Sequence, residues 1–206
     1  MAKTTKTASA RRHAIDAFRR QGGILRTRDA LSAGVHPRTL YQLRDEGAIE
    51  ALSRGLYRLA ATEPFGNPDL VTVAKRVPNG VICLISALAY HEVTTEIPHE
   101  IYLAIARSAK KPRIDYPPVR AFWFSGGAFA EGIEVHDLDN VPVRIYSLEK
   151  TLADCFKYRN KIGMDTVLEA LRLSRERKRL NIDAVVRFAE ICRVKKAMTP
   201  YLESIL

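Results

Sequence analysis

Glycine and proline residues divide residues 27–59 into short segments, and this spacing constrains the fold more than any other feature of the chain. Thr27 is expected to cap a first helix, and Gly34 suits the left-handed conformation that commonly follows the end of a helix. Pro37 fits the first turn of a second helix, because its missing N–H would have no helical partner there. Gly47 ends this second helix. The sequence therefore predicts two short helices joined by a tight turn.

The second predicted helix has one apolar and one polar face. A step of about 100° per residue places Leu40 and Leu43 on the buried side. The opposite side carries Arg38, Tyr41, Gln42 and Asp45. A short helix that offers Arg, Tyr and Gln outward beside a tight turn is typical of helix-turn-helix DNA readers. Most helix–turn–helix pairs in proteins bind nothing, so the DNA-binding hypothesis needs support from other features.

A two-stranded wing is predicted directly after this helix. Two short apolar segments flank a turn that contains glycine, which is the pattern of a β-hairpin. Arg54 lies at the tip and Arg58 on the second strand, from where both can reach phosphates or a minor groove. For Arg58 an ion pair with Glu46 or Glu50 is the alternative, and the sequence leaves it open.

Positive charge is concentrated in the same part of the chain. Residues 1–60 carry twelve Lys or Arg and five Asp or Glu, a net charge of +7, whereas residues 61–206 have a net charge of +3. Residues 1–8 are expected to form a flexible basic arm, followed by a supporting helix over residues 9–21. Such charge suits phosphate neutralisation with release of counterions, so double-stranded DNA is the expected partner. A merely soluble basic surface is the alternative.

Composition and cysteine usage argue against several classes of protein. No apolar run approaches the roughly 20 residues of a membrane span, and the basic N-terminus lacks the apolar core of a secretory signal. Cys83, Cys155 and Cys192 are odd in number and far apart, which favours reduced thiols in a cytoplasm over disulfides or a Cys-x-x-Cys metal site. We expect a cytoplasmic protein with no cofactor and no metal site.

A linker separates two predicted domains. Residues 61–68 hold two prolines, a glycine and an asparagine, so we expect a winged helix-turn-helix domain over residues 1–62 and a second domain over residues 63–206. The second domain mixes helical segments with four extended segments, which suggests an α/β domain with an antiparallel or mixed sheet. The expected fold class is α+β, with strands near residues 100–106, 119–125, 133–136 and 141–146.

Catalysis is the competing hypothesis for the second domain. Gly126 and Gly127, followed by Asp137 and Asp139, loosely resemble a nucleotidyltransferase signature, in which a Gly-rich turn grips a phosphate and two carboxylates hold Mg²⁺. The segment ending at Asn140 is better explained as a turn, and the following strand offers no third carboxylate. The sequence therefore predicts no catalytic residue and no enzyme. A nucleotidyltransferase or nuclease is the less favoured alternative.

Three consecutive aromatic residues, Phe122, Trp123 and Phe124, lie in one of the extended segments. Alternate side chains of a strand face opposite sides, so these three cannot all point inward. The sequence leaves open whether a helix of this chain or another protein covers the second face.

Several segments resemble the AbiEi-type antitoxins. In the first domain these are residues 23–27 (GILRT) and 53–59 (SRGLYRL), the second of which resembles the wing of that family. In the second domain they are residues 86–94 (SALAYHEVT) and 143–154 (VRIYSLEKTLAD). The last segment contains Glu149, Lys150 and Asp154, which can equally serve capping and packing where the sheet meets the helix.

The resemblance implies a transcriptional repressor that is also the antitoxin of a bacterial toxin–antitoxin or abortive-infection operon. The winged domain would bind inverted repeats in its own promoter, with oligomerisation on DNA, and the second domain would counter a nucleotidyltransferase-like toxin. A winged-helix regulator whose second domain senses a ligand or dimerises is the alternative. In the implied interface Arg38 and Gln42 reach base edges, while Arg28 and Arg44 hold phosphates. The other expected DNA-binding residues are Thr39, Tyr41, Arg54 and Arg58.

Overall fold

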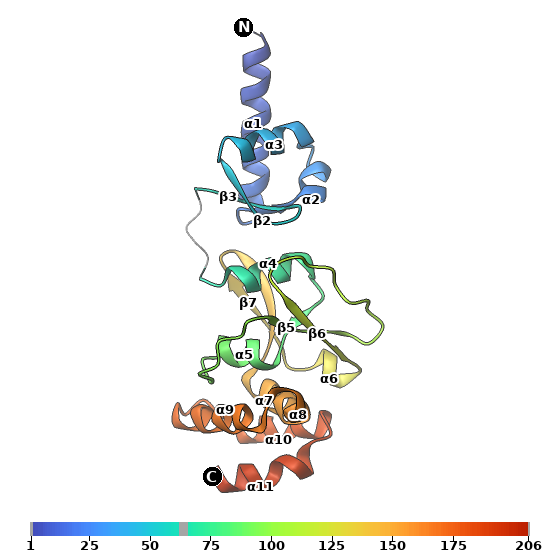
Figure 1. The fold of residues 1–206 in the computed structure, drawn as a ribbon, viewed down its shortest axis with the longest axis vertical. Coiled ribbons are helices and arrows are strands. Elements are labelled where there is room, and N and C mark those ends of the chain that lie inside the picture. Colours follow the sequence, from blue (N-terminus) through green and yellow to red (C-terminus); the bar gives the residue numbers. More distant parts are fainter. Residues whose placement is uncertain (1, 62–65, 206) are drawn as a thin grey trace. The chain divides into compact units, whose positions relative to one another are not determined.

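The computed structural model describes the backbone of residues 2–61 and 66–205, and the side chains of residues 8–61 and 66–204 (Figure 1). The chain is mixed α/β, with helices and two sheets. It divides into two compact units, the first made of residues 1–76 with residues 115–117 and 137–142, and the second of the remainder. The domain boundary predicted between residues 62 and 63 lies outside the described residues and stays a prediction.

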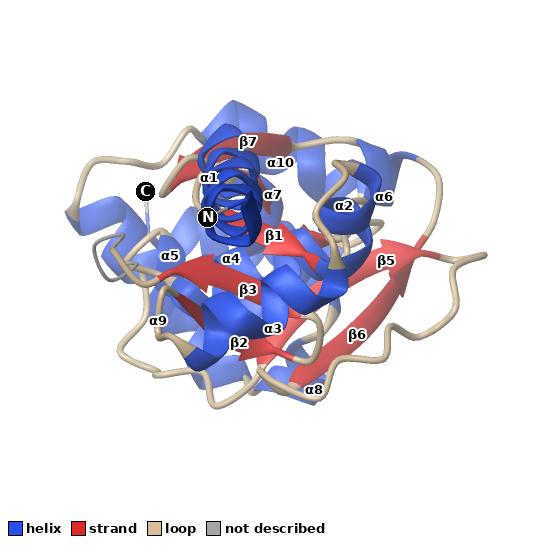
Figure 2. Cartoon of the chain, turned by 90° about the horizontal axis from the view of Figure 1, so that it is seen from above, coloured by secondary structure: helices blue, strands red, loops and turns tan. Residues whose placement is uncertain are grey.

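The first unit begins with helices and a small antiparallel sheet. β3 lies between β1 and β2, as Figure 2 shows. The elements are α1 (Ala2–Arg20), β1 (Ile24–Arg26), α2 (Thr27–Ser32), α3 (Pro37–Asp45), β2 (Ile49–Ser53), β3 (Leu56–Leu59) and α4 (Pro68–Arg76). The two short helices and the hairpin that the glycine and proline spacing predicted are therefore present.

The backbone of residues 2–8 forms the first part of α1, which extends from Ala2 to Arg20, and is not the coil expected of a flexible arm; residue 1 lies outside the described residues. These first residues are polar, but they include neither glycine nor proline. Extending an existing helix costs far less than nucleating a new one, so polar residues without a helix breaker continue it. Polarity alone was a poor argument for a coil.

The caps of α2 and α3 differ from the sequence prediction in one respect. Thr27 was expected to cap α2, but Arg26 holds the N-cap position without a side-chain bond, and Thr27 Oγ1 donates to the Gly55 carbonyl at 3.4 Å. A threonine that bonds across to the hairpin is unavailable to cap its own helix. Pro37 does begin α3, and the His36 side chain caps this helix by accepting from the Arg38 N–H, a cap that was not predicted.

A separate apolar core holds these helices to the sheet. Ala14, Ala17 and Phe18 line the inner face of α1. They pack against apolar residues of α2, α3 and the small sheet. Because the apolar face of α3 is buried in this core, the orientation of the helix is fixed. The remaining buried members are Leu25, Ala30, Val35, Leu40, Leu43, Ile49 and Tyr57.

The five-stranded sheet is mixed, which is one of the two alternatives that the sequence left open. Its strand order is β6-β5-β4-β8-β7, with β4 antiparallel to β5 but parallel to β8, and β5 parallel to β6. Asp139 and Asn140 both have positive φ between β7 and β8, which confirms a turn there. The strands are β4 (Val81–Ile82), β5 (Ile101–Ala106), β6 (Val119–Phe124), β7 (Ile133–Leu138) and β8 (Val141–Tyr146).

A helical layer packs on this sheet around one central helix, α7 (Leu148–Lys157), which contacts α5, α9 and α10. Ser147 caps α7 and Asn181 caps α10, both through their side chains. The other helices are α5 (Leu84–Tyr90), α6 (Gly127–Ala130), α8 (Arg159–Ile162), α9 (Met164–Glu176), α10 (Ile182–Ile191) and α11 (Lys195–Ile205).

The aromatic run in β6 alternates as expected. Phe122 and Phe124 are buried, whereas Trp123 is 44% exposed. Tyr158, which follows α7, packs against both phenylalanines with ring centroids 5.2 and 5.5 Å away. Part of the chain itself therefore covers the phenylalanine face.

Candidate nucleic-acid interface

The outward face of α3 carries the side chains that the sequence assigned to it. Arg38, Tyr41 and Gln42 are exposed, while Leu40 and Leu43 are buried in the core beneath. The exposed fraction of Tyr41 is 51%, which is high for a large aromatic side chain. The predicted orientation of this helix is therefore confirmed at the level of its two faces.

The polar side chains of this face are held by their neighbours along the same helix. Gln42 Nε2 donates to Glu46 Oε1 at 2.8 Å. Arg44 donates to Asp45 Oδ1 from Nε at 3.0 Å and Nη2 at 2.8 Å, and this bond raises the pKa of Arg44. The same guanidinium lies 5.3 Å from the centre of the Tyr41 ring. These exposed bonds position the side chains yet can be exchanged for other partners.

The two hairpin arginines have different surroundings. Arg54 is exposed in the turn beside Gly55. Arg58 lies opposite Glu50 across the two strands and donates to its Oε2 from Nε at 2.9 Å and Nη2 at 2.7 Å. The side chain of Arg58 is only 19% exposed. Of the two carboxylates considered from the sequence, Glu50 is the partner, while Glu46 pairs with Arg11 at 3.5 Å.

The remaining predicted residues lie near the start of each helix. Arg28 is exposed on α2 and its Nε donates to Asp29 Oδ1 at 3.1 Å. Thr39 is half-buried in the first turn of α3. Both helices and the hairpin thus belong to one small core, and they present all of the predicted DNA-binding residues except Arg58 and Thr39 as exposed side chains.

Arg26 was missing from the sequence prediction. Its guanidinium Nη2 is buried and has no hydrogen-bond partner within the described chain, and the same is true of Ser53 Oγ. Both residues pair with Leu56, one from each side of β3. Burial and the nearby Arg28 lower the pKa of Arg26. Its place in a three-residue strand gave no sequence signal that Nη2 would be buried without a hydrogen bond.

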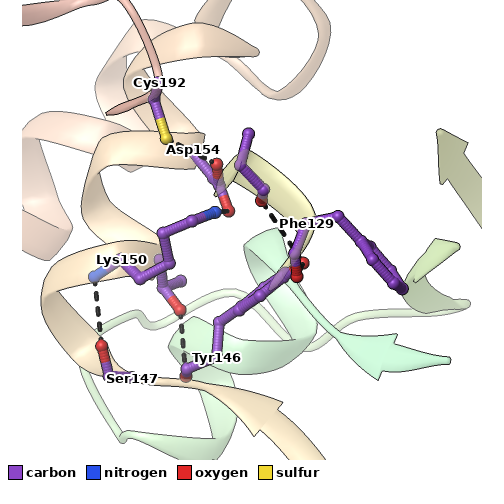
Figure 3. A network of polar contacts seen from close by, with 8 residues as sticks. Phe129, Tyr146, Ser147, Lys150, Asp154 and Cys192 are labelled. Carbon is purple, nitrogen blue, oxygen red and sulfur yellow. Dashed lines mark hydrogen bonds and ion pairs between the residues drawn. The ribbon is translucent and has the colours of Figure 1, made fainter. Parts of the chain in front are cut away.

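The segment of residues 143–154 forms a polar network inside the second unit (Figure 3). Lys150 Nζ donates to Asp154 Oδ2 at 2.5 Å, and neither side chain is exposed to solvent. The ammonium lies 4.1 Å from the centre of the Tyr146 ring, and the Cys192 thiol donates to Asp154 Oδ1 at 3.2 Å. Burial raises the pKa of Asp154 against the opposing effect of Lys150.

The surrounding bonds join β8 to α6 and to the end of α5. The Tyr146 hydroxyl donates to the Phe129 carbonyl at 2.8 Å, and the Tyr146 carbonyl accepts from His91 Nε2 at 2.8 Å. Ser147 accepts from the Lys150 N–H to cap the helix (Figure 3). The capping and packing role considered from the sequence is confirmed for Lys150 and Asp154.

The carboxylates that raised the nucleotidyltransferase alternative occupy a hairpin. Asp137 is exposed on β7, and Asp139 lies in the turn that follows. Within residues 2–61 and 66–205, no group of three or more His, Cys, Asp or Glu side chains is placed to hold a metal ion. Among the same residues, no helix has both the length and the apolar character needed to cross a membrane.

One comparison with known proteins gives a match that lies within the first unit. Residues 13–60 match the model of a family described as "Transcriptional regulator, AbiEi antitoxin", which confirms the resemblance over this part of the chain. The crystal structure of the RV2827C protein from Mycobacterium tuberculosis is similar over 88% of this chain and 71% of that chain, with a TM-score of 0.59 and 12% identity. That identity supports a shared fold alone. Comparison with curated proteins found no match.

Proposed function

We propose, from the match of residues 13–60 to the AbiEi antitoxin regulators, that this protein is a DNA-binding transcriptional repressor and the antitoxin of a bacterial toxin–antitoxin operon. The observation that carries the proposal is that the family match and the exposed face of α3 fall in the same residues. The matched residues are those that form α2, α3 and the hairpin, and they contain the exposed face of Arg38, Tyr41 and Gln42. We interpret this unit as a winged helix-turn-helix domain.

In the proposed complex α3 enters the major groove of duplex DNA. The exposed Arg38 guanidinium makes no hydrogen bond or ion pair with another side chain of the described residues, and an arginine pairs well with the O6 and N7 atoms of guanine. Gln42 must exchange its bond to Glu46 for adenine N6 and N7. Tyr41 and Thr39 add contacts along the same groove.

Phosphate contacts fix the register of the helix. Arg28 and Arg44 are exposed and donate to the carboxylates that follow them in the chain, Asp29 and Asp45, so each can turn to a phosphate. Arg54 reaches the backbone or a minor groove from the hairpin tip. Arg58 contributes only where its bond to Glu50 opens, which makes it the weakest of the proposed contacts.

The role proposed for the second domain is binding and not catalysis. In this proposal the protein acts in the cytoplasm, represses its own promoter at inverted repeats and counters a nucleotidyltransferase-like toxin. The buried position of Lys150 and Asp154 supports a structural role for the segment that resembles the family here.

The test is a fluorescence anisotropy titration of the full chain with duplex DNA from the region upstream of its own gene. Arg38→Ala should weaken binding by about 1–3 kcal/mol and relax preference at one base pair. Arg54→Ala should weaken binding to all sequences alike and reduce the salt slope by about one. Arg172→Ala removes an exposed arginine of α9 and is the matched control. Unchanged binding by both interface variants would disprove the assignment of this surface.

A further inference from the structure

β6 is an edge strand whose outer side is open. In the strand order its pairing partner within the described residues is β5 alone. The Pro118 carbonyl accepts from the Ile101 N–H at 2.8 Å, and alternate residues of a parallel strand bond to the same neighbour. The backbone N–H and C=O groups of residues 119, 121 and 123 therefore point away from β5.

Of the usual protections against another strand, β6 has one charged side chain, Arg120, but neither a proline nor a bulge. Natural edge strands are shielded by proline, bulges or charged side chains. β6 contains no proline and pairs with β5 in unbroken register. The strand at the opposite edge, β7, is six residues long and carries two exposed carboxylates, Glu134 and Asp137. β6 instead presents the exposed Trp123.

A groove of about 420 Å³ runs beside this open edge. One wall is the strand itself, at Ala121 and Trp123. The other is formed by aromatic rings, since Phe122 and Tyr158 meet edge to face with centroids 5.2 Å apart. A strand laid along β6 would place alternate side chains in this groove, as the pleat of a sheet requires.

The rim of the groove is cationic. The Arg120 guanidinium lies 5.6 Å from the centre of the Phe122 ring, and Lys161 Nζ lies 5.6 Å from that of Tyr158. Arg120 Nη1 has one carboxylate nearby, Glu100 at 3.5 Å.

The loop between β5 and β6 adds further positive charge. The Trp123 indole N–H donates to the Ala109 carbonyl at 3.0 Å, which holds part of this loop beside the edge strand. The exposed basic residues of the loop are Arg107, Lys110, Lys111 and Arg113.

We propose that β6 and this groove bind an extended acidic segment of a partner protein, which adds to the sheet as a further strand. Backbone bonds to residues 119, 121 and 123 supply the affinity, and carboxylates of the segment pair with Arg120 and Lys161. An apolar side chain of the segment packs on Tyr158 and Trp123. The surface lies in the second unit and stands independently of DNA binding by the first.

The chain has a built-in reporter, because Trp123 is its one tryptophan. The full chain is titrated with a short capped peptide of alternating Glu and Val with a central Phe, and indole fluorescence is recorded. We expect a saturable change. A peptide with Lys in place of Glu should bind at least about tenfold more weakly, since the rim charges then repel it. The acidic peptide with two adjacent central residues N-methylated should not bind, because it lacks the N–H groups needed for strand addition.

Variants of the chain locate the binding. Lys161→Glu should weaken binding of the acidic peptide about tenfold. Arg172→Glu, which changes an exposed residue of α9, should leave this binding unchanged. Ala121→Pro removes an N–H that points away from β5, a position where an edge strand tolerates proline, and should abolish binding while circular dichroism shows a folded chain.

Three results would overturn the proposal. The first is equal binding of the parent and N-methylated peptides. The second is a fluorescence response to single-stranded oligonucleotide, lost in Lys161→Glu, without any response to the acidic peptide. The third is self-association of the chain that Ala121→Pro abolishes, with no peptide binding, which would make a second copy the occupant of the edge.

Discussion

Ion pairs on the surface of the first unit differ from one that is buried in the second. On α2 and α3, Arg28 and Arg44 pair with the adjacent Asp29 and Asp45 in the open. In the second unit Lys150 and Asp154 form an ion pair that solvent does not reach. Water already solvates and screens the exposed pairs, so their partners can be exchanged for a phosphate at little cost. The buried pair has no such alternative, because each charge depends on the other for its stabilisation.

The difference teaches that the solvent exposure of an ion pair decides whether its charges can bind another partner. Lys150 and Asp154 are four residues apart on α7, the spacing of an ordinary surface ion pair on a helix. Because the aromatic ring of Tyr146 and the thiol of Cys192 enclose the pair, it connects α7 to β8 and to the end of α10. Its function is to stabilise one arrangement of the core.

The largest effect should come from breaking the buried pair. Lys150→Met leaves the Asp154 carboxylate without its cation and should lower the free energy of unfolding by about 3–5 kcal/mol, as measured by urea denaturation. The double variant Lys150→Met/Asp154→Leu removes both charges and should lose much less, because no unpaired charge remains. A double variant that is less stable than the single variant would show that the pair is not the source of the stability.

The pH dependence of Lys150→Met sharpens this test. Burial raises the pKa of Asp154, and removing the ammonium removes the chief opposing effect. A carboxyl whose pKa is higher in the folded than in the unfolded state favours folding when protonated, so its destabilisation is greatest above the folded pKa. The deficit of the variant relative to the wild type should therefore shrink as the pH is lowered toward about 4. A deficit that is constant with pH would indicate lost packing alone.

Gly132→Ala should disturb the same network by a smaller amount. Gly132 has a φ of +74°, and an added Cβ would lie 2.7 Å from Lys150 Cβ. Left-handed strain and crowding of the lysine stem together should cost about 2–3 kcal/mol in thermal or urea unfolding. Gly47→Ala is the matched control, because its φ is also positive but nothing lies within 4 Å of the added Cβ. If the two variants lost equal stability, backbone strain alone would explain the loss, and crowding of Lys150 would contribute nothing.

The sequence predicted the first unit well because its signals are local. Gly34 and Pro37 set the boundaries of α2 and α3 by backbone geometry alone, and the alternation of Leu40 and Leu43 with polar residues set the faces. The prediction failed where a partner came from a distant segment. Thr27 bonds to the hairpin at Gly55, which no property of residues 24–30 could reveal.

In the second unit the sequence predicted strands and helices but not their chemistry. The mixed sheet followed from the segment pattern, whereas the burial of Lys150 depends on β8, α7 and α10 coming together. The candidate interface shows the same limit, because both Glu46 and Glu50 were within reach of Arg58 in sequence. Only the register that sets Arg58 opposite Glu50 selects the partner.

The smallest predicted effect concerns the exposed pairs. Asp45→Asn takes away the carboxylate that holds Arg44 by two bonds, and it removes a negative charge from the face proposed to meet DNA. Promoter affinity should rise by about twofold to fivefold without new base preference, because Arg44 is freed for a phosphate. Thermal stability should not fall, since a negative charge at the C-terminal end of a helix is unfavourable. Asp183→Asn on α10 changes the net charge equally and is the control. Equal gains from both variants would mean that net charge alone, and not the release of Arg44, governs affinity.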